Sequence, residues 1–227
     1  MTIALERPIR YPDSDGKPMS DNTEQFKWIV LIKENLECLF AENPEVFIAG
    51  DLLWYPVEGH PEICAAPDAM AAFGRPKGYR GSYQQWKEEG IAPQVTFEIL
   101  SPSNTLKEMT KKQEFYERYG VEEYYIYDPD RNDLNGLLRV DDRLTVIDEI
   151  RDWVSPRLGI RFLVTDETLE VYYPDGRRFL TTVEFSHQAQ EATARAEQET
   201  NRANQEADRA ARLAERLRSL GIDPEQI

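Results

Sequence analysis

Two acidic residues lie inside short apolar runs, where a carboxylate is costly to place. Asp68 opens the run Ala69–Phe73, and Glu98 lies within the run Val95–Leu100. The length and the β-branched or aromatic content of these runs favour buried strands over helices. A carboxylate in such a strand needs a cation or a hydrogen-bond donor to compensate its desolvation. If the two strands are neighbours, Asp68 and Glu98 could hold a hard divalent cation, which prefers oxygen ligands. The pair therefore points to metal-assisted chemistry.

A small basic cluster, Arg75, Lys77 and Arg80, follows the Asp68 strand. Lysine and arginine charges supply much of the affinity for nucleic-acid phosphates, so these residues are candidates for phosphate contacts. Simpler interpretations stay open: the cluster could be a solvated loop, and Asp68 could cap a turn. Glu98 could pair with an arginine in the core, as buried acids ordinarily do.

Composition limits the class of protein. The chain has 227 residues, of which 41% are hydrophobic, enough for one domain with a real core and an appendage. The net charge of −15 argues against non-specific coating of DNA, but it allows a small basic cleft. The two histidines, His60 and His187, argue against a His-rich zinc site.

The cysteines and the apolar runs indicate the cellular compartment of the protein. Cys38 and Cys64 have no metal-ligand spacing and resemble reduced thiols. No apolar run approaches the roughly 18–20 residues of a membrane span. Residues 1–11 lack a signal-like apolar stretch. These features predict a soluble, cytoplasmic protein without a membrane partner.

The elements that position the candidate residues follow in a definite order. Helical spacing begins near Ser20 or Asp21, either of which could cap the helix, and it stops at Asn43-Pro44. The next predicted elements are strands at Val46–Tyr55 and Asp68–Phe73, a short helix at Ser82–Glu89, a strand at Val95–Leu100, a helix at Thr105–Tyr119 that ends at Gly120, and a strand at Tyr124–Tyr127. Without the short helix the order is helix, strand, strand, strand, helix, strand.

The last third of the chain contains two different patterns. Short strand-like runs predict an added β-meander, at Leu144–Ile147, Ile160–Val164, Leu169–Tyr173 and Arg177–Leu180. From Glu184 to Leu220 there is no Gly or Pro, and strong helix formers dominate, so we expect one long helix. Its apolar seam has steps of three and four residues, at Ala203, Ala207, Ala210, Ala214 and Leu217. The seam could pair with a second copy, or the helix could be single and solvated.

Four motifs together resemble the Uma2 family (also called DUF820) of the PD-(D/E)XK nuclease superfamily, and its cyanobacterial members in particular. They are Ala66-Pro67-Asp68, Phe73–Gly78, Phe97–Asn104 and Gly120–Pro129. Their order and spacing are more specific than any one of them, and the match runs from about Tyr11 to the C-terminus. The resemblance implies an α/β fold with a restriction-endonuclease-like core, in which a mixed sheet carries two carboxylates at its catalytic edge. The helix and strand order predicted above is the order that such a core requires.

The resemblance also implies roles for individual residues. Asp68 matches the family's PD aspartate, and Glu98 matches the acidic residue of the second motif. The superfamily places a lysine two residues after this acid, where the present chain has Leu100. In Uma2-like proteins a lysine of the following helix is expected to take its place, and Lys112 matches it. Two lysines of the same helix are alternatives, Lys107 and Lys111.

The domain organisation predicted from these patterns has four parts. They are an irregular N-terminal arm at 1–19, a PD-(D/E)XK nuclease-like domain at 20–183, an Ala/Glu/Arg-rich helix and possible coiled coil at 184–220, and a C-terminal stop at 221–227 that contains Asp223-Pro224.

The function implied by the resemblance is a Mg²⁺- or Mn²⁺-dependent endonuclease that acts on DNA. Asp68, Glu98 and the carbonyl oxygen of Ile99 would hold the ion, and Lys112 would act on the attacking water or the phosphoryl oxygens. Asp51 could join the metal site or could occupy a strand end or bulge. Two other functions stay open: a non-catalytic module that self-associates or binds a partner through the C-terminal helix, and a metal-dependent phosphodiesterase acting on RNA or a small nucleotide.

Overall fold

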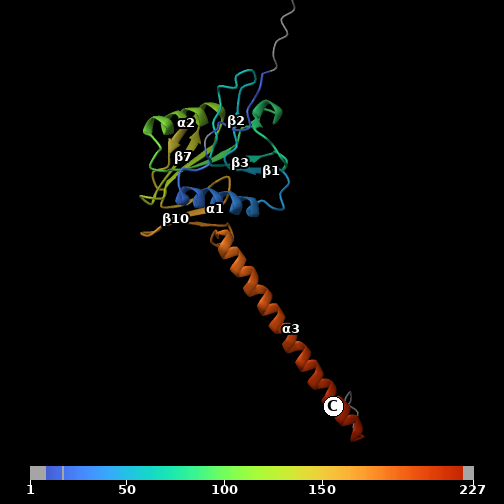
Figure 1. Ribbon diagram of the computed structural model, residues 1–227. Helices are drawn as coiled ribbons and strands as arrows, with labels where there is room; N and C mark the ends of the chain where they lie inside the picture. Colours follow the sequence, from blue (N-terminus) through green and yellow to red (C-terminus); the bar gives the residue numbers. More distant parts are fainter. Residues whose placement is uncertain (1–8, 17, 222–227) are drawn as a thin grey trace, which may run out of the picture. The chain divides into compact units, whose positions relative to one another are not determined.

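The computed structural model describes residues 9–16 and 18–221. It divides the chain into two compact units, Met1–Phe179 and Leu180–Ile227, the first with all the strands and the second with one long helix (Figure 1). In the predicted N-terminal arm, the described residues form no helix or strand. The predicted stop at Asp223-Pro224 lies outside the described residues.

A six-stranded mixed sheet, in the order β1-β3-β5-β6-β7-β8, organises the first unit. Its strands are β1 Val46–Ala49, β3 Ala69–Phe73, β5 Val95–Ile99, β6 Glu123–Asp128, β7 Asp133–Val140 and β8 Arg143–Val146. β5 and β6 run parallel, and the other neighbours are antiparallel. A parallel pair needs a crossover connection, which α2, Leu106–Tyr119, supplies. With α1, Thr23–Leu39, ahead of β1, the predicted helix and strand order is confirmed.

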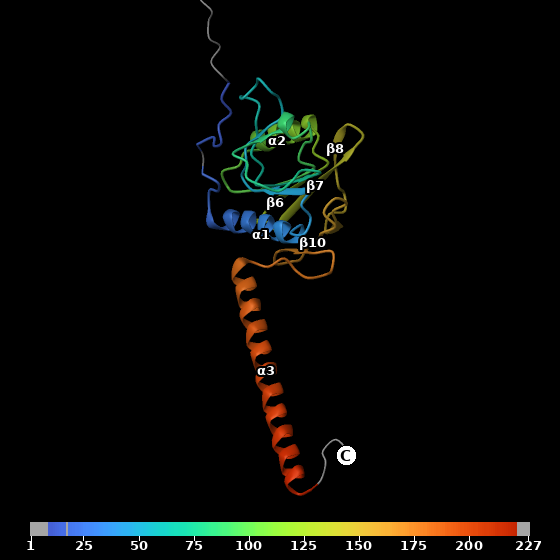
Figure 2. The same ribbon diagram turned by 90° about the vertical axis from the view of Figure 1, so that its right-hand side faces the viewer.

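Two helices cover opposite faces of this sheet (Figure 2). Trp28 of α1 belongs to the same hydrophobic cluster as Phe97 of β5. Tyr116 of α2 belongs to a second cluster, together with Met70 of β3. Because successive side chains of a strand point to opposite faces, β5 directs Phe97 toward α1 and Glu98 toward α2. The alternation thus gives the acidic residue of β5 to the face that α2 covers.

Local signals set the ends of α2 and α1. Thr105 forms a capping box with Glu108 at the start of α2, and Gly120 ends the helix in the left-handed region at φ +103°, as predicted. The predicted cap of α1 was wrong by one residue. Asn22 caps the helix, because its side chain accepts the N–H of Gln25 at 2.8 Å.

Two predictions between α1 and β5 are corrected. The run Val46–Tyr55 is not one strand, because Asp51 adopts φ +46° and separates β1 from β2, Trp54–Tyr55. The run Ser82–Glu89 is not an α-helix. It forms β4, Tyr83–Gln84, which pairs in parallel with β2, and one turn of 3₁₀ helix, Gln85–Lys87.

The expected β-meander is corrected in its first run: Leu144–Ile147 contributes to β8, which pairs with β7 at the edge of the central sheet. The runs Ile160–Val164 and Leu169–Tyr173 supply two strands of a separate three-stranded antiparallel sheet in the order β11-β10-β9. Its strands are β9 Asp152–Val154, β10 Arg161–Val164 and β11 Leu169–Tyr172. Phe162 and Val171 join the hydrophobic cluster of α1, so this sheet packs on the α1 side. The predicted strand at Arg177–Leu180 is absent from the described residues. An isolated β-bridge joins Arg178 to Tyr172.

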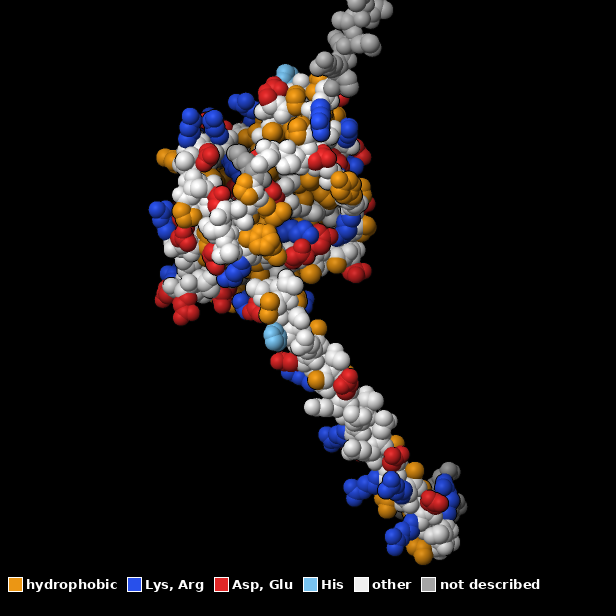
Figure 3. Space-filling model, viewed as in Figure 1, with side chains coloured by type: hydrophobic (Ala, Val, Ile, Leu, Met, Phe, Trp, Pro, Cys, Tyr) orange, Lys and Arg blue, Asp and Glu red, His pale blue; other side chains and the backbone are white. Residues whose placement is uncertain are grey.

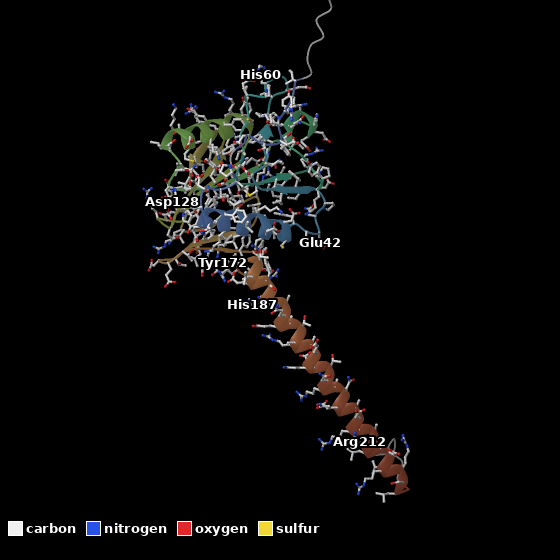
Figure 4. All side chains as sticks on the ribbon, viewed as in Figure 1. Glu42, His60, Asp128, Tyr172, His187 and Arg212 are labelled. Carbon is white, nitrogen blue, oxygen red and sulfur yellow. The ribbon has the colours of Figure 1, made fainter. Side chains whose placement is uncertain are left out.

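The second unit contains α3, Thr182–Ser219, which confirms the long C-terminal helix. A capping box of Thr181 and Glu184 begins it, and none of its described residues is buried. His187 and Arg212 project from the helix (Figure 4). No helix among the described residues is long and apolar enough to cross a membrane.

Candidate active site

The structure brings Asp68, Glu98 and Lys112 together, although they lie on three different elements. Asp68 directly precedes β3, Glu98 lies on the adjacent strand β5, and Lys112 lies on α2. The ammonium of Lys112 is 2.5 Å from Oε2 of Glu98 and 3.2 Å from the carbonyl oxygen of Ala66. Of the three candidate lysines, Lys112 is the one for which the described part of the chain shows a contact with Glu98.

Asp68 is buried and anchored to the neighbouring strand. Its Oδ2 accepts the N–H of Ile99 at 2.6 Å, and its Oδ1 accepts no hydrogen bond from the described residues. Burial and, next, the charge of Glu98 raise the pKa of Asp68 to about 8, and the nearby Lys112 ammonium offsets part of this rise. With this pKa Asp68 is mostly protonated at neutral pH, and a bound cation would favour its ionised form.

Glu98 is held by α2 through both carboxylate oxygens. Oε2 accepts from Lys112, and Oε1 accepts the hydroxyl of Tyr116 at 2.5 Å. Sequence analysis did not find Tyr116. Its spacing of four residues from Lys112 is the available signal, because this spacing puts two side chains on one helix face.

The carbonyl oxygen of Ile99, which was predicted to bind the metal, has a hydrogen-bond partner that was not predicted from the sequence. Nε2 of Gln25, on the first turn of α1, donates to this oxygen at 2.8 Å. The contact joins residues 74 positions apart. A second lone pair of the carbonyl oxygen is left for another donor or an ion.

A cavity of about 570 Å³ opens beside Asp68 and Lys112. The acidic residues that line it are Asp15, Asp21, Asp51, Asp68 and Glu108, and the basic ones are Lys111 and Lys112. This wall is therefore predominantly acidic. A polyanion meets repulsion here unless a bound cation reduces the charge.

Asp51 lies in the turn after β1, where its backbone is left-handed, and it lines the cavity. Its N–H lies 3.1 Å from the carbonyl oxygen of Pro67 and 3.3 Å from that of Asp68, which ties this turn to the start of β3. Burial and the charge of Asp15 raise the pKa of Asp51, while Lys112 opposes the rise. Asp51 thus occupies the turn after a strand end, as one alternative predicted, and it also lines the cavity; its role in a metal site stays a prediction.

The Ser-Pro-Ser-Asn motif shapes one wall of the cavity. Ser101 donates its hydroxyl to Asp21 at 2.7 Å, and Ser103 also donates to Asp21. The N–H of Ser101 donates to Oδ1 of Asn104 at 2.8 Å. The motif thus ties the loop before α2 to the segment before α1, and this explains why Asp21 does not cap α1.

The predicted phosphate-contacting residues lie elsewhere, in ion pairs. Arg80 contacts Glu88 through Nε at 2.6 Å and Nη2 at 3.0 Å, and Nε of Arg75 lies 3.2 Å from the same carboxylate. Lys77 contacts Glu37 on α1 at 3.2 Å. None of the three basic residues lines the cavity. Their role in binding nucleic acid stays a prediction.

Two observations bear on a divalent metal. No group of three or more Asp, Glu, His or Cys side chains within the described ranges is arranged to hold an ion. The donor chemistry nevertheless fits a hard cation, because three carboxyl groups, of Asp51, Asp68 and Glu98, surround the one ammonium of Lys112 and offer more oxygen atoms than it can contact. Glu98 would offer Oε2 to an ion if Lys112 moved away.

Comparison with known proteins identifies the family. The Uma2 family, described as "Putative restriction endonuclease", matches residues 6–203. The chain belongs to this family, and the resemblance predicted from the motifs is confirmed. None of the curated proteins matches the chain. Among solved structures, the chain is similar to "a putative nuclease belonging to DUF820" from Anabaena variabilis ATCC 29413, with 17% identity, 60% of this chain and 73% of that chain covered, and a TM-score of 0.44.

Proposed function

We propose that this protein is a Mg²⁺- or Mn²⁺-dependent endonuclease that hydrolyses phosphodiester bonds in DNA. The observation that carries the proposal is the contact of Lys112 with the carboxylate of Glu98, beside the buried Asp68 and the cavity. A lysine next to two carboxylates is a set of groups that metal-assisted phosphoryl chemistry uses. Membership of the Uma2 family supports the same class of reaction.

Each residue has a defined task in this proposal. Asp68, Glu98 and the carbonyl oxygen of Ile99 would hold the ion. The chemistry that bound Mg²⁺ supplies is polarisation of the scissile phosphate and activation of a water molecule. The N–H of Ile99 holds Oδ2 of Asp68, which leaves Oδ1 for the ion. Lys112, released from Glu98, would stabilise the negative charge that grows on the phosphoryl oxygens.

Because acidic residues predominate around the cavity, a bound metal ion would also help the site to bind the negatively charged DNA. Lys111 lines the cavity and is the basic residue best placed to contact a phosphate next to the cleaved one. On the face drawn in Figure 3, acidic and basic side chains of the first unit are interspersed and do not form a basic stripe. We therefore expect DNA to bind more tightly when a divalent ion is present.

A cleavage assay with matched variants tests the proposal. The wild type should nick supercoiled plasmid in Mg²⁺ or Mn²⁺ and should be inactive in EDTA. D68N, E98Q and K112M should each lose at least about 100-fold in rate. K107M, which removes a lysine of the same helix outside the cavity, should keep the wild-type rate. Undiminished cleavage by D68N and E98Q would reject this site.

Cleavage of RNA but not of DNA would favour the phosphodiesterase alternative.

Absence of both cleavage and metal binding would favour the non-catalytic module. Calorimetric titration of Mg²⁺ and Mn²⁺ into the wild type and into the D68A/E98A double variant decides this point. Heat that disappears in the double variant would support the metal site. If the wild type alone shows no heat, the titration is repeated with DNA present, because a substrate phosphate could complete the site.

We also propose that two copies of the chain associate through α3. Ten positions at alternating steps of three and four residues carry only Ser, Thr, Ala or Leu, and they form an uncharged seam from Ser186 to Leu217. They are Ser186, Ala189, Thr193, Ala196, Thr200, Ala203, Ala207, Ala210, Ala214 and Leu217. A seven-residue repeat sustained over more than four heptads is typical of a helix that supercoils with another helix.

Charge favours an antiparallel arrangement of these two helices. Residues 182–200 contain four glutamates and one arginine, whereas residues 201–219 contain five arginines and three acidic residues. The arginine side chains of α3 accordingly gather toward its C-terminal end (Figure 3). Antiparallel pairing puts each acidic half beside a basic half and opposes the two helix dipoles.

Sedimentation equilibrium and cross-linking test this association. A203E/A210E places two charges in the seam and should abolish self-association. Q198E/Q205E adds the same charge on the opposite helix face and should leave it intact. In a variant without Cys38 and Cys64, a mixture of A189C and A214C chains should cross-link if the helices are antiparallel. Cross-linking of A189C chains alone would indicate a parallel pair, and a monomeric wild type would reject the proposal.

A further inference from the structure

We propose that Tyr116 is a positioning residue for this reaction: its hydroxyl holds Oε1 of Glu98, so that Oε2 stays directed toward the metal when Lys112 leaves. The inference rests on the proposed metal-dependent nuclease function. It assigns a task to a residue that touches neither the proposed ion nor the substrate.

The two donors to Glu98 differ in their access to the cavity. Lys112 lines the cavity, and 29% of its side chain is exposed. Tyr116 is fully buried and does not line it. An ion that enters from the cavity can therefore replace Lys112 at Oε2, whereas the bond from Tyr116 to Oε1 is out of its reach. One end of the carboxylate stays fixed while the other exchanges its partner.

The ring of Tyr116 is itself held in place. It lies parallel to the indole of Trp54, with a centroid distance of 6.1 Å, and edge-on to Tyr124 at 4.9 Å. The carbonyl oxygen of Tyr116 accepts the N–H of Gly120 and that of Val121 at the end of α2. Because ring and backbone are both fixed, the hydroxyl reaches Glu98 from one direction. A ligand held in this way loses less conformational freedom when it binds a metal.

A neighbouring tyrosine separates the role of the hydroxyl from that of the ring. Tyr124 is also fully buried and packs against Tyr116, but its hydroxyl has no hydrogen-bond partner among the described residues. Replacing Tyr124 by phenylalanine therefore removes a buried hydroxyl without removing a bond to Glu98. Y124F is the matched control for Y116F.

The test is a calorimetric titration of Mn²⁺ into the full-length wild type, Y116F and Y124F without DNA. Phenylalanine keeps the ring contacts, and Glu98 keeps its pair with Lys112, so both variants should fold. Near-ultraviolet circular dichroism checks this. Y116F should bind Mn²⁺ about 10- to 100-fold more weakly, the usual effect of losing a group that orients a metal ligand. Y124F should bind like the wild type. In cleavage assays, Y116F should need more metal for half-maximal rate, while KM for DNA measured at saturating metal stays unchanged.

The possible outcomes are distinct. A folded Y116F with wild-type affinity for Mn²⁺ overturns the inference and leaves the proposed function standing. Equal weakening in Y116F and Y124F also overturns it, because the effect would then come from packing. A wild type that binds no metal, with or without DNA, rejects the proposed function and the inference with it. Weakening confined to Y116F supports the positioning role.

Discussion

Lys112 and Glu98 are 14 residues apart in the sequence, yet the ammonium nitrogen lies 2.5 Å from a carboxylate oxygen. The position two residues after Glu98, where the superfamily pattern has a lysine, is Leu100. In this chain Lys112 of α2 supplies the cation that contacts Glu98, and its side chain is still partly exposed to the cavity. The ammonium that pairs with Glu98 therefore also faces the space in which the proposed function puts the substrate.

Replacing Lys112 should separate metal binding from catalysis. In K112M, Glu98 and Asp68 lose the cation that compensates them, so we expect the metal-free protein to lose about 1–3 kcal/mol of stability. The same loss of positive charge should tighten binding of Mg²⁺, while the cleavage rate falls by at least about 100-fold. Urea unfolding in EDTA, calorimetry and plasmid cleavage measure the three effects. K107M is the control, and weaker Mg²⁺ binding by K112M would contradict the exchange of Lys112 for the ion.

The pKa of Asp68 predicts how stability depends on pH. It is about 8 in the folded protein, against an ordinary value of 3.8. Between these values the folded state binds more protons than the unfolded state, so the free energy of unfolding falls as pH rises. In EDTA the wild type should therefore be less stable at about pH 8 than at about pH 5. D68N cannot ionise at this position and should show a shallower fall.

Unfolding by urea at several pH values measures this dependence. Bound Mg²⁺ should restore stability at the alkaline end in the wild type but not in D68N, because it stabilises the ionised carboxylate. Equal pH dependence in the wild type and D68N would show that Asp68 is not the group responsible.

The candidate site shows what a sequence can and cannot predict. Asp68 and Glu98 are visible because a charge interrupts an apolar run, and the Uma2 resemblance selects Lys112 on the helix that follows. Tyr116 and Gln25 give no such signal, because tyrosine and glutamine are ordinary on amphipathic helices. Their roles depend on contacts across 18 and 74 positions.

The basic cluster shows a second limit of the sequence, because the ion pairs of Arg75, Lys77 and Arg80 were not predicted. Three cations in a Gly- and Pro-rich loop resemble a phosphate-binding surface, and their charge alone suggests exposure. Glu88, the partner of Arg75 and Arg80, follows Arg80 by 8 residues, and it was part of a predicted helix. Glu37, the partner of Lys77, lies 40 positions away on α1. Local pattern alone cannot distinguish such ion pairs from free charges.

Strands were predicted well where apolar residues dominate and missed where they do not. β7, Asp133–Val140, contains Asn135 and Gly136, which disfavour a strand. It forms because β6 offers an edge to pair with. Glycine suits position 136, because a Cβ there would lie only 2.9 and 2.7 Å from the Cδ1 atoms of Ile147 and Ile150. Tertiary pairing thus overrides the local preference. β1, β3, β5 and β6 needed no such help, because apolar and aromatic residues dominate their buried runs.

Arg80 should matter chiefly for stability. Its guanidinium pairs with Glu88 through two nitrogens, and both side chains are nearly buried, at 13% and 11% exposure. R80A leaves the nearly buried Glu88 with Arg75 as its remaining cation, so the variant should lose about 1–3 kcal/mol. R80K should not restore this, because lysine lacks the two-pronged geometry. Denaturant unfolding of R80A, E88Q and the double variant measures the coupling, which should make the double loss smaller than the sum.

DNA binding by the same variants decides between the two roles of Arg80. A phosphate contact would make R80A weaken binding for every sequence and lower the salt dependence by about one unit of slope. If the ion pair is its main role, R80A and E88Q should instead lose similar stability, with the salt dependence of DNA binding unchanged.

Glu123 is a buried carboxylate outside the candidate site, and it should contribute to stability without affecting metal binding. It is fully buried on β6, and its oxygens accept the hydroxyl of Tyr125 at 2.8 Å, the N–H of Arg157 at 2.6 Å and the hydroxyl of Ser155. These bonds join the central sheet to the segment after β9. Burial raises the pKa of Glu123, and its hydrogen bonds oppose that rise.

In E123Q one oxygen becomes an amide nitrogen that faces donors, so at least one of these bonds is lost. We expect the free energy of unfolding to fall by about 1–3 kcal/mol. Glu123 alternates with Tyr124 along the strand and points to the face opposite Glu98, so Mn²⁺ affinity should equal that of the wild type. Unfolding and calorimetry on E123Q and E98Q make the comparison: E98Q should lose the metal, and E123Q should lose only stability. Loss of Mn²⁺ binding in a folded E123Q would show that the two buried acids are coupled across the sheet.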